Sequence, residues 1–299
     1  MTADLVHYES LDEDSARWIG FEFRDGDVVI STRSKTGSTW VQMICALLIF
    51  QSPDLPARLS EISPWLDWLI VPRSEVYARL AAQDHRRFIK THTPLDGVPI
   101  DSKATYIVTG RHPLDMAVSL YHQGANIDRD RLRQLTGGPE PTAPTRQRPE
   151  VTEWLVSWID KDSDPRESPD SLPGVMWHLS DAWARRHEPN ILLLHYADLL
   201  RDLEAEMRRM AEHLKILVPE DRWPSLVAAA TFDGMRLRSE VTVPDPSGIF
   251  IDRAAFFRGG RSGDGSALLN NEQIDRYHRT ASKLAPPDML EWLHDGTAC

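Results

Sequence analysis

The chain has 299 residues, of which 41% are hydrophobic and 26% charged, so it has the composition of a folded protein and wholesale disorder is excluded. Its 34 Lys and Arg residues against 45 Asp and Glu give a net charge of −11, which argues against general binding to nucleic acid or to an anionic membrane but permits a local basic pocket. Residues 41–50, the longest apolar run, span about half of the ~20 residues that a membrane-spanning helix needs, so no integral membrane segment is expected.

The first ten residues and the two cysteines bear on the cell compartment in which the protein works. The first ten residues carry Asp4, His7 and Glu9 instead of the basic and apolar regions of a secretory signal, which predicts a cytoplasmic protein. Cys45, in an apolar run, and Cys299 are too few for a disulfide framework or a cysteine metal cluster. We expect Cys45 to be a buried apolar residue and, since no His, Cys and Asp residues have ligand spacing, we expect no metal.

Short apolar runs alternate with longer amphipathic segments along the chain. The pattern predicts strands at 27–31, 87–90, 104–109 and 191–194, and helices at 39–50, 113–122, 151–159 and 203–214, with two more helices in 270–294 divided by Pro286-Pro287. Buried strands separated by helices indicate an α/β fold with a central, mainly parallel sheet flanked by helices. Ligands of such sheets bind beyond the carboxyl ends of the strands.

Two stretches rich in Pro, Ser and Asp, residues 137–149 and 161–173, are predicted to be mobile loops. Together with the helix between them they predict a mobile insertion or lid around 124–173. Because no internal repeat or linker divides the chain, we expect a single domain comprising residues 1–299.

Five aromatic residues between positions 65 and 158 have two interpretations. The pairs Trp65/Trp68 and Trp154/Trp158 have helical spacing, which is typical of core residues. With Tyr121, the same residues could instead line an apolar pocket.

The most informative segment is 31–40, where a lysine, a glycine and several hydroxyl residues stand at a predicted strand-to-helix turn. Backbone N–H groups at a helix N-terminus bind anions, glycine permits close backbone approach, and lysine adds a charge. The segment therefore predicts an anion cradle, although a capped helix start with a solvated lysine would have the same residue types. It is not a Walker A loop, because Lys35 precedes Gly37.

Two further strand ends carry residues suited to chemistry. His92 ends the predicted strand 87–90 and has the one unperturbed pKa suited to taking a proton near neutral pH, although a strand-end histidine is more often simply hydrogen-bonded. Arg111 follows the next strand, and Ser119 lies on the helix after it; a guanidinium and a hydroxyl can together hold a phosphate. Taken alone, Arg111 would be expected to pair with Asp115.

The three segments, in this order, resemble those of the cytosolic-type sulfotransferases, and the chain resembles a bacterial member of this family. Its members move a sulfuryl group from 3′-phosphoadenosine 5′-phosphosulfate (PAPS) to a hydroxyl or amine. The family loop T-Y-P-K-S-G-T-T-W stands here as residues 32–40, its K-T-H strand end as 90–92, and its R-[NH]-P-x-D-x-x-x-S segment as 111–119. Residues 195–202, 231–235 and 256–260 resemble its Y-E-D-[ML]-x-x-[DN], S-F-x-x-M and F-[MF]-R-[KR]-G segments. The resemblance covers residues 15–285 and implies the P-loop-like sulfotransferase fold.

The resemblance also implies roles for the matched residues in a metal-independent, in-line transfer. His92 is expected to act as general base, Lys35 as the cation on the leaving oxygen, and Lys90 as a second charge near the sulfonate. Lys35 and the residues Thr36, Gly37, Ser38 and Thr39 would hold the 5′-phosphate; Trp40 would stack on the adenine, with Tyr196, Thr231 and Met235 on the nucleotide; and Arg111, Ser119, Phe257, Arg258, Gly259 and Gly260 would surround the 3′-phosphate.

The last of these segments departs from the family pattern. Gly259 stands where the family has a second basic residue, which removes a partner of the 3′-phosphate worth ~1.5–3 kcal/mol unless Arg261 substitutes for it. Gly265 and Ser266 stand in place of the family's Trp and Lys. The family's dimer motif is not recognisable in residues 268–272, so the oligomeric state is left open.

The loop also departs, since Arg33-Ser34 replaces the family's Tyr-Pro, and Arg33 is either close to the cofactor or solvated. The acceptor is not encoded in the cradle: a phenol, a sterol-like molecule or the sugar of a glycolipid would each fit an apolar pocket beside a histidine. Two other functions would use similar residues. A catalytically inactive PAP-binding or nucleotide-binding scaffold is disfavoured by the presence of both Lys35 and His92, and a small-molecule kinase by the missing Walker A order.

Overall fold

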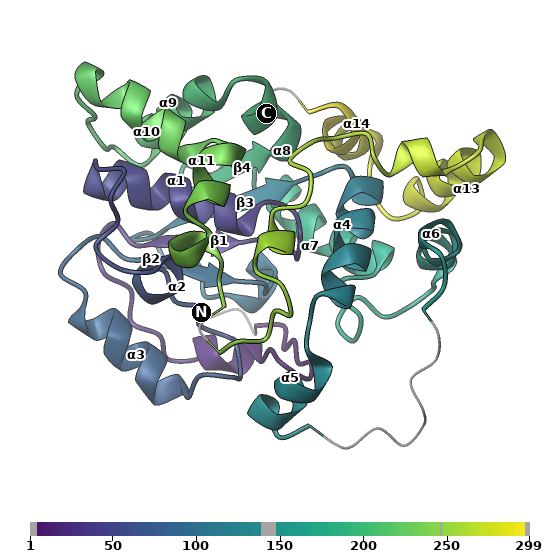
Figure 1. The fold of residues 1–299 in the computed structure, drawn as a ribbon, viewed down its shortest axis with the longest axis horizontal. Helices are drawn as coiled ribbons and strands as arrows, with labels where there is room; N and C mark the ends of the chain where they lie inside the picture. The colour runs from purple at the N-terminus through teal and green to yellow at the C-terminus, as the bar shows by residue number, and fades with distance from the viewer. Residues whose placement is uncertain (1–4, 139–147, 246, 297–299) are drawn as a thin grey trace.

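The computed structural model describes residues 5–138, 148–245 and 247–296. Its centre is a parallel sheet with the strand order β2-β1-β3-β4 (Figure 1). The strands are β1 (Val28–Ser31), β2 (Phe88–Thr91), β3 (Thr105–Gly110) and β4 (Ile191–His195). The α/β class is confirmed, and each strand lies within one residue of its predicted bounds.

The strand order determines where a ligand can bind. β1 pairs in parallel with β2 on one side and with β3 on the other, with Ser31 opposite both Thr91 and Val108. The connections that leave β1 and β3 therefore diverge to opposite sides of the sheet. The carboxyl ends of β1 and β3 leave a crevice at this switch point, which is the usual ligand position in such sheets.

Helices cover both faces of the sheet (Figure 1). They are α1 (Ser38–Phe50), α2 (Leu59–Ile62), α3 (Arg73–Ala82), α4 (Pro113–Ala125), α5 (Arg129–Thr136), α6 (Val151–Asp160), α7 (Leu172–Ala184), α8 (Tyr196–Arg201), α9 (Leu203–His213), α10 (Trp223–Ala230), α11 (Phe232–Leu237), α12 (Ser239–Thr242), α13 (Asn271–Ala281) and α14 (Pro287–Asp295). The six helices predicted from the sequence are confirmed, including the two separated at Pro286. No helix in the described ranges combines the length and the apolar character needed to cross a membrane.

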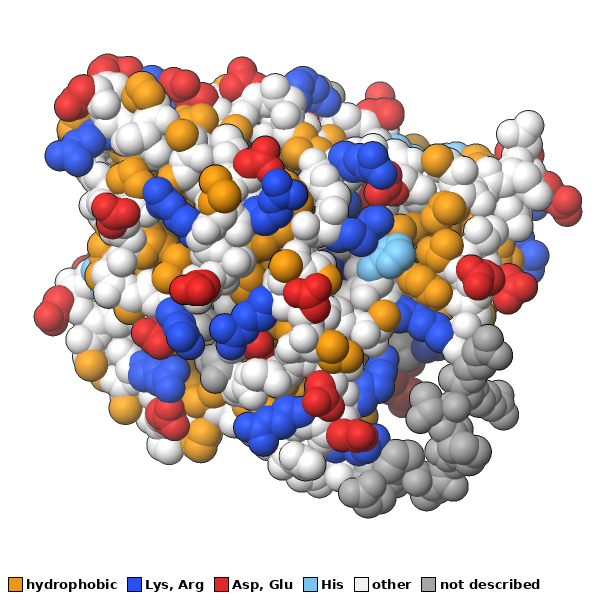
Figure 2. Space-filling view, in the orientation of Figure 1, with side chains coloured by type: hydrophobic (Ala, Val, Ile, Leu, Met, Phe, Trp, Pro, Cys, Tyr) orange, Lys and Arg blue, Asp and Glu red, His pale blue; other side chains and the backbone are white. Residues whose placement is uncertain are grey.

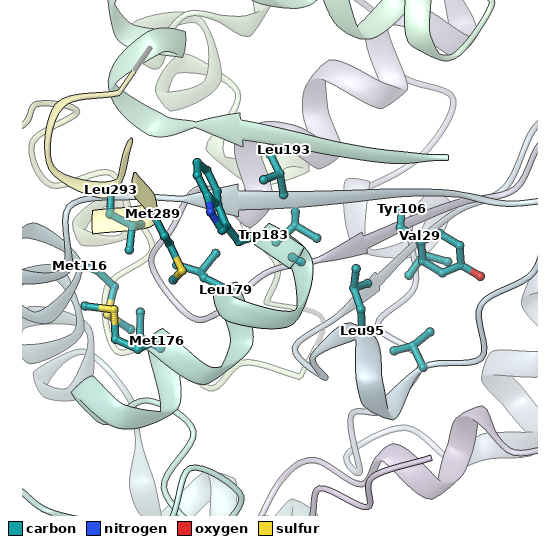
Figure 3. Packing of buried hydrophobic residues seen from close by; sticks show 14 of the residues in the cluster. Val29, Leu95, Tyr106, Met116, Met176, Leu179, Trp183, Leu193, Met289 and Leu293 are labelled. Carbon is teal, nitrogen blue, oxygen red and sulfur yellow. The ribbon is translucent and has the colours of Figure 1, made fainter. Parts of the chain in front are cut away.

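Alternate residues of each strand face two separate hydrophobic clusters. Val29, Tyr106 and Leu193 belong to the cluster with α4, α7 and α14, which Figure 3 shows from close by. Ile30 and Leu192 belong to the other cluster, with α1, α9 and α10. Each aliphatic side chain of this kind stabilises the fold by about 1.5–3 kcal/mol when it is fully buried. Cys45 lies in the second cluster as a buried free thiol, as predicted.

In its described residues, the predicted insertion 124–173 contains the helices α5 and α6. α5 has no buried residue, whereas α6 buries Leu155, Trp158 and Ile159 in the first cluster. Of the loop predicted at 137–149, residues 139–147 lie outside the described residues. The loop predicted at 161–173 ends two residues earlier than expected, because α7 begins at Leu172, where the Ser171 side chain caps its N-terminus.

Candidate active site

A cavity of about 550 Å³ opens beyond the carboxyl ends of the strands. Its wall includes every residue predicted for the site except Thr36 and Thr231. His92, Arg111 and Tyr196 each directly follow a strand, which is why residues far apart in the sequence meet here. Figure 2 shows one face of the molecular surface, on which acidic and basic side chains are interspersed. The net negative charge of the chain is therefore not concentrated on this face.

The loop from β1 to α1 has the form of an anion cradle. Lys35 and Gly37 both have left-handed backbone conformations, with φ of 66° and 116°. Gly37 is the N-cap of α1, and no described side chain caps this helix end. The first N–H groups of a helix have no partner within the helix and carry the positive end of its dipole, so this end of α1 is available to an anion. Position 37 favours glycine for two reasons: its backbone is left-handed, and a Cβ there would lie 3.3 Å from the Tyr196 ring.

Thr36 holds the cradle in place and does not face the cavity. Its hydroxyl is buried, donates to the carbonyl oxygen of Arg33 at 2.8 Å, and is hydrogen-bonded to the Thr109 hydroxyl at 2.9 Å. The loop after β1 is thereby tied to β3. The predicted contact of this side chain with a phosphate is therefore not supported by its position.

Lys35 extends into a cavity with several other cations. Its ammonium lies 4.7 Å from the centre of the Phe256 ring. Burial, together with the nearby positive charges of Arg111, Lys90 and Arg258, lowers the pKa of Lys35 to about 7. An anion in this cavity would remove the repulsion and favour the charged form of the lysine.

Arg111 has the position expected of an anion-binding arginine. It donates to the carbonyl oxygen of Lys35 at 3.0 Å, and its guanidinium lies 4.2 Å from the centre of the Tyr196 ring. Its Nε is buried and has no hydrogen-bond partner among the described residues. A buried donor of this kind costs about 1–3 kcal/mol when it is left without a partner, so the site gains when a ligand supplies one.

The segment 256–265 is fixed against the start of α4. Asp115, expected to pair with Arg111, instead accepts hydrogen bonds from the backbone N–H groups of Gly263 and Gly265, both at 2.8 Å. A Cβ at Gly265 would lie 2.4 Å from the backbone of Leu114. The tryptophan that the family has at this position therefore does not fit here, which explains one of the departures.

Arg258 and Arg261 share one carboxylate. Arg258 lies 3.2 Å and Arg261 2.8 Å from the oxygens of Asp264, and both arginines line the cavity. Arg261 is 72% exposed, so it can move toward a ligand. Gly259 has room for a side chain, because its nearest neighbours would be 3.8 Å or more from a Cβ.

His92 and Lys90 form the other end of the site. His92 Nδ1 is hydrogen-bonded to the carbonyl oxygen of Thr32, and its ring meets Trp65 edge-on at 4.5 Å. The Lys90 ammonium lies 3.6 Å from the centre of the Trp65 ring, and this ring is also stacked on Trp68 at 5.0 Å. Burial and the charges of Lys90 and Arg33 hold the pKa of His92 well below its usual 6.5. Burial lowers the pKa of Lys90 to about 8.

Arg33 is neither solvated nor free to bind a cofactor. Its guanidinium is 3% exposed, donates to the carbonyl oxygen of His92, and forms an ion pair with Asp170 at 2.8 Å. The sequence left its position open, and only its departure from the family pattern marked it. Asp170 and Glu13, which also face it, were not identified from the sequence at all.

The predicted adenine end is only partly brought together. Trp40 is 9% exposed, donates to the carbonyl oxygen of Ala230 at 2.8 Å, and meets the Tyr196 ring at 5.3 Å. Met235 lines the same wall. Thr231 caps α11, where its hydroxyl accepts from the N–H of Gly234 at 3.0 Å, and it does not reach the cavity.

Four of the five aromatic candidates line the cavity. Trp65, Trp68, Trp154 and Trp158 do so, whereas the Tyr121 hydroxyl donates to the carbonyl oxygen of Pro149. Residues 65–68 are not helical, in spite of their spacing. Trp65 instead forms a bridge with Lys90 beside the edge of the sheet.

Comparison with known proteins identifies the family. The model of the sulfotransferase domain matches residues 25–295. Glycolipid sulfotransferases of Mycobacterium bovis (strain BCG / Pasteur 1173P2) and Mycobacterium tuberculosis (strain ATCC 25177 / H37Ra) are 42% and 41% identical, each over 98% of this chain and 95% of the relative.

Solved structures show the same fold at low sequence identity. Retinol dehydratase in complex with androsterone and the inactive cofactor PAP aligns with a TM-score of 0.69 and 20% identity, over 92% of this chain and 87% of that one. Mouse sulfotransferase SULT7A1 complexed with PAP aligns with a TM-score of 0.68 and 18% identity, over 93% of this chain and 90% of that one. The matched domain and the two mycobacterial relatives together show that this chain belongs to the sulfotransferase family.

Proposed function

We propose that this sulfotransferase moves a sulfuryl group from PAPS to a hydroxyl of a small-molecule acceptor, and that the acceptor is the sugar of a glycolipid. The observation that carries the reaction is the position of His92, a buried neutral imidazole in the same cavity as Lys35 and Lys90. The acceptor class is supported by the two mycobacterial relatives, which are named glycolipid sulfotransferases.

The residues of the cavity fit a nucleotide with phosphates at two positions. The uncapped end of α1 and Lys35 would hold the 5′-phosphosulfate, with the hydroxyls of Ser38 and Thr39 as further donors. The unpartnered Nε of Arg111 suits the 3′-phosphate. The residues proposed to complete the binding site are Ser119, Arg258, Gly259 and Gly260 around the 3′-phosphate, and Trp40, Tyr196, Met235 and Phe257 on the nucleoside. When bound, PAPS supplies the activated sulfuryl group.

The side chains then divide the work of the transfer. His92 accepts the acceptor's proton at Nε2 while the acceptor oxygen bonds to sulfur and the bond between sulfur and the phosphate oxygen breaks. The Thr32 carbonyl holds the Nδ1 proton, so the ring is oriented for this step. Lys35 neutralises the charge that develops on the leaving phosphate oxygen, and Lys90 stabilises the sulfonate. The protein contributes mainly orientation and fixed positive charge, as in phosphoryl transfer.

We also interpret residues 1–299 as one domain that works in the cytoplasm. The match of the family domain to residues 25–295 supports the first statement. The second statement stays a prediction.

The proposal is tested in two steps. First, 3′,5′-adenosine bisphosphate (PAP) is titrated against AMP, ADP and ATP in a thermal-shift experiment; PAP at 100 times its dissociation constant should stabilise the fold by about 2.7 kcal/mol, more than the other nucleotides. Second, transfer of ³⁵S from PAPS is compared for a glycolipid, a simple phenol and a primary amine. We expect the glycolipid to have the highest kcat/KM. A preference for ATP would overturn the reaction, and a preference for the phenol or amine would overturn the acceptor class alone.

A further inference from the structure

Arg33 is a buried arginine with partners on three sides. It is the second residue after β1, and its side chain is 3% exposed. Its guanidinium donates to the carbonyl oxygen of His92 and, through Nε and Nη2, to Asp170 Oδ1 at 3.2 and 2.8 Å. Glu13 Oε2 lies 3.7 Å from Nη1. A planar guanidinium can serve these partners at once, which a lysine ammonium cannot do with the same geometry.

The carboxyl groups of Glu13 and Asp170 come from separate segments that line the cavity near His92, the side on which we propose that the acceptor binds. Asp170 directly precedes the cap of α7, and its carbonyl oxygen accepts from Trp158 Nε1 at 2.9 Å. Glu13 belongs to an N-terminal segment that forms a bridge with Trp68. Arg33 therefore joins the N-terminal segment and the segment before α7 to the strand ends that carry the chemistry.

His92 is held to the same short stretch at two points. Its ring is hydrogen-bonded to the carbonyl oxygen of Thr32, and its own carbonyl oxygen accepts from Arg33. Residues 32 and 33 are also the start of the cradle that contains Lys35. The position of the imidazole relative to the cradle is thus set by two neighbouring residues.

We propose that Arg33 is a positioning residue for sulfuryl transfer, which holds His92 against the cradle and fixes the acceptor-side wall of Glu13 and Asp170 to both. The inference rests on the proposed function, because it takes His92 as the base. Arg33 does not touch the reacting atoms in this role. Arg33 stands where the family loop T-Y-P-K-S-G-T-T-W has tyrosine, so the loop pattern itself does not predict this arrangement.

Removal of the guanidinium changes the charges around His92 as well as its position. Arg33 and Lys90 are the cations that lower the pKa of His92, with a smaller contribution in the same direction from His178 on α7. Asp170, Glu13 and Asp67 are the carboxyl groups that face Arg33, and burial raises the pKa of Glu13 to about 8. Loss of the arginine charge should therefore raise the pKa of His92, and the acid limb of the pH–rate profile should move to higher pH.

Four variants test the role. We expect R33Q to lower kcat on the order of 100-fold, as a displaced catalytic group does, with the KM for PAPS and the affinity for PAP changed by less than about twofold. R33K should recover part of kcat and keep the acid limb where it is in the wild type, because it keeps the charge. D170N should lower kcat less than R33Q does and should not move the acid limb upward, since Arg33 is retained.

R87Q is the matched control for the loss of a buried arginine. Arg87 is 5% exposed and paired with Asp27 just before β2 and β1, at the end of the sheet away from His92. This variant should lower Tm and leave kcat and the acid limb unchanged.

The outcomes separate the inference from the proposed function. A folded R33Q variant with wild-type kcat and an unmoved acid limb overturns the positioning role, as does an equal loss of kcat in R33Q and R87Q. An active H92A variant overturns the base assignment instead. If H92A is inactive and R33Q is wild-type, the inference about Arg33 fails alone.

Discussion

His92 Nδ1 donates a hydrogen bond to the carbonyl oxygen of Thr32. A carbonyl oxygen can only accept, so this bond places the ring proton on Nδ1 and leaves the lone pair on Nε2. Burial and the two nearby cations keep the ring neutral, because they lower its pKa well below 6.5. An imidazole in this state is able to take a proton throughout the neutral pH range, as the proposed role of general base requires.

Replacement of His92 by alanine should lower kcat by at least about 100-fold, which is the usual contribution of a general base. PAP affinity should change little, because the imidazole lies at the acceptor end. His187→Ala, at an exposed histidine, serves as the control and should be as active as the wild type. A wild-type rate for the His92 variant would end its assignment as base.

The acid limb of the wild-type profile of kcat/KM for the acceptor should lie below pH 6.5. The sign follows from the lowered pKa: the neutral, active ring is present above the pKa of His92 and is lost as the pH falls through it. Measurement at saturating PAPS isolates this limb. An acid limb above pH 7 would contradict the structure.

Binding of PAP should be accompanied by proton uptake at pH 8. Lys35 has a pKa of about 7 in the free protein, so it is mostly neutral at that pH, and a bound phosphate favours its charged form. Affinity should therefore fall as the pH rises above 7. Calorimetry in buffers of different ionisation enthalpy measures the uptake, and Lys35→Ala should abolish most of it. Equal uptake in the variant would assign the proton elsewhere, with Lys90 the next group to test.

Gly259→Lys should tighten PAP binding by about five- to tenfold, or about 1–1.4 kcal/mol. A side chain fits at this position, and the change restores the basic residue of the family pattern. Gly260→Ala is the contrasting variant: φ is 62° there and a Cβ would lie 2.6 Å from the Phe232 ring, so it should lower Tm and weaken PAP binding. Unchanged affinity in Gly259→Lys would show that Arg261 already fills the role.

Asp115→Asn should weaken PAP binding by about tenfold while kcat at saturating PAPS is preserved. The carboxylate accepts two backbone N–H groups of the segment that carries Arg258, and an amide has only one acceptor oxygen. We expect the binding loop to become less ordered and kcat to be kept, because Asp115 is buried and does not line the cavity. A fall in kcat with unchanged PAP affinity would contradict this role.

EDTA should leave the rate of sulfuryl transfer unchanged. Lys35, Lys90, Arg111 and Arg258 line one cavity and can neutralise the phosphates and the sulfonate directly. The measurement is the initial rate with and without chelator, with ATP-driven phosphorylation assayed in parallel. A rate that requires a divalent cation would favour a kinase-like reaction.

Local signals were sufficient to predict the strands and the cradle. Runs of apolar, β-branched residues define β1 and β4, and the loop after β1 has its glycine where the backbone requires a left-handed conformation. The order of three strand-turn-helix units also predicts that Lys35, His92 and Arg111 lie at one edge of the sheet. Parallel strands make such a prediction possible, because their carboxyl ends meet at one edge.

Contacts between segments that are distant in the sequence could not be predicted from it. The ion pair of Arg33 with Asp170 spans 137 positions, and no local pattern encodes it. Thr231 shows the opposite failure: its residue type matched a motif, yet its hydroxyl is used to cap a helix, which competes with ligand binding for the same oxygen. The spacing of Trp65 and Trp68 is typical of a helix, but these residues are not helical, and Trp65 instead forms a short bridge with Lys90.

The contact between Lys90 and Trp65 gives the protein its own optical reporter. An ammonium 3.6 Å from the centre of an indole ring alters the electric field that the ring's excited state experiences. If a sulfonate draws that ammonium away, the emission of this one tryptophan should shift, and the difference spectrum against Trp65→Phe should isolate it from the other nine tryptophans. Occupancy of the transfer site can then be followed in real time, without a label and before any product is formed.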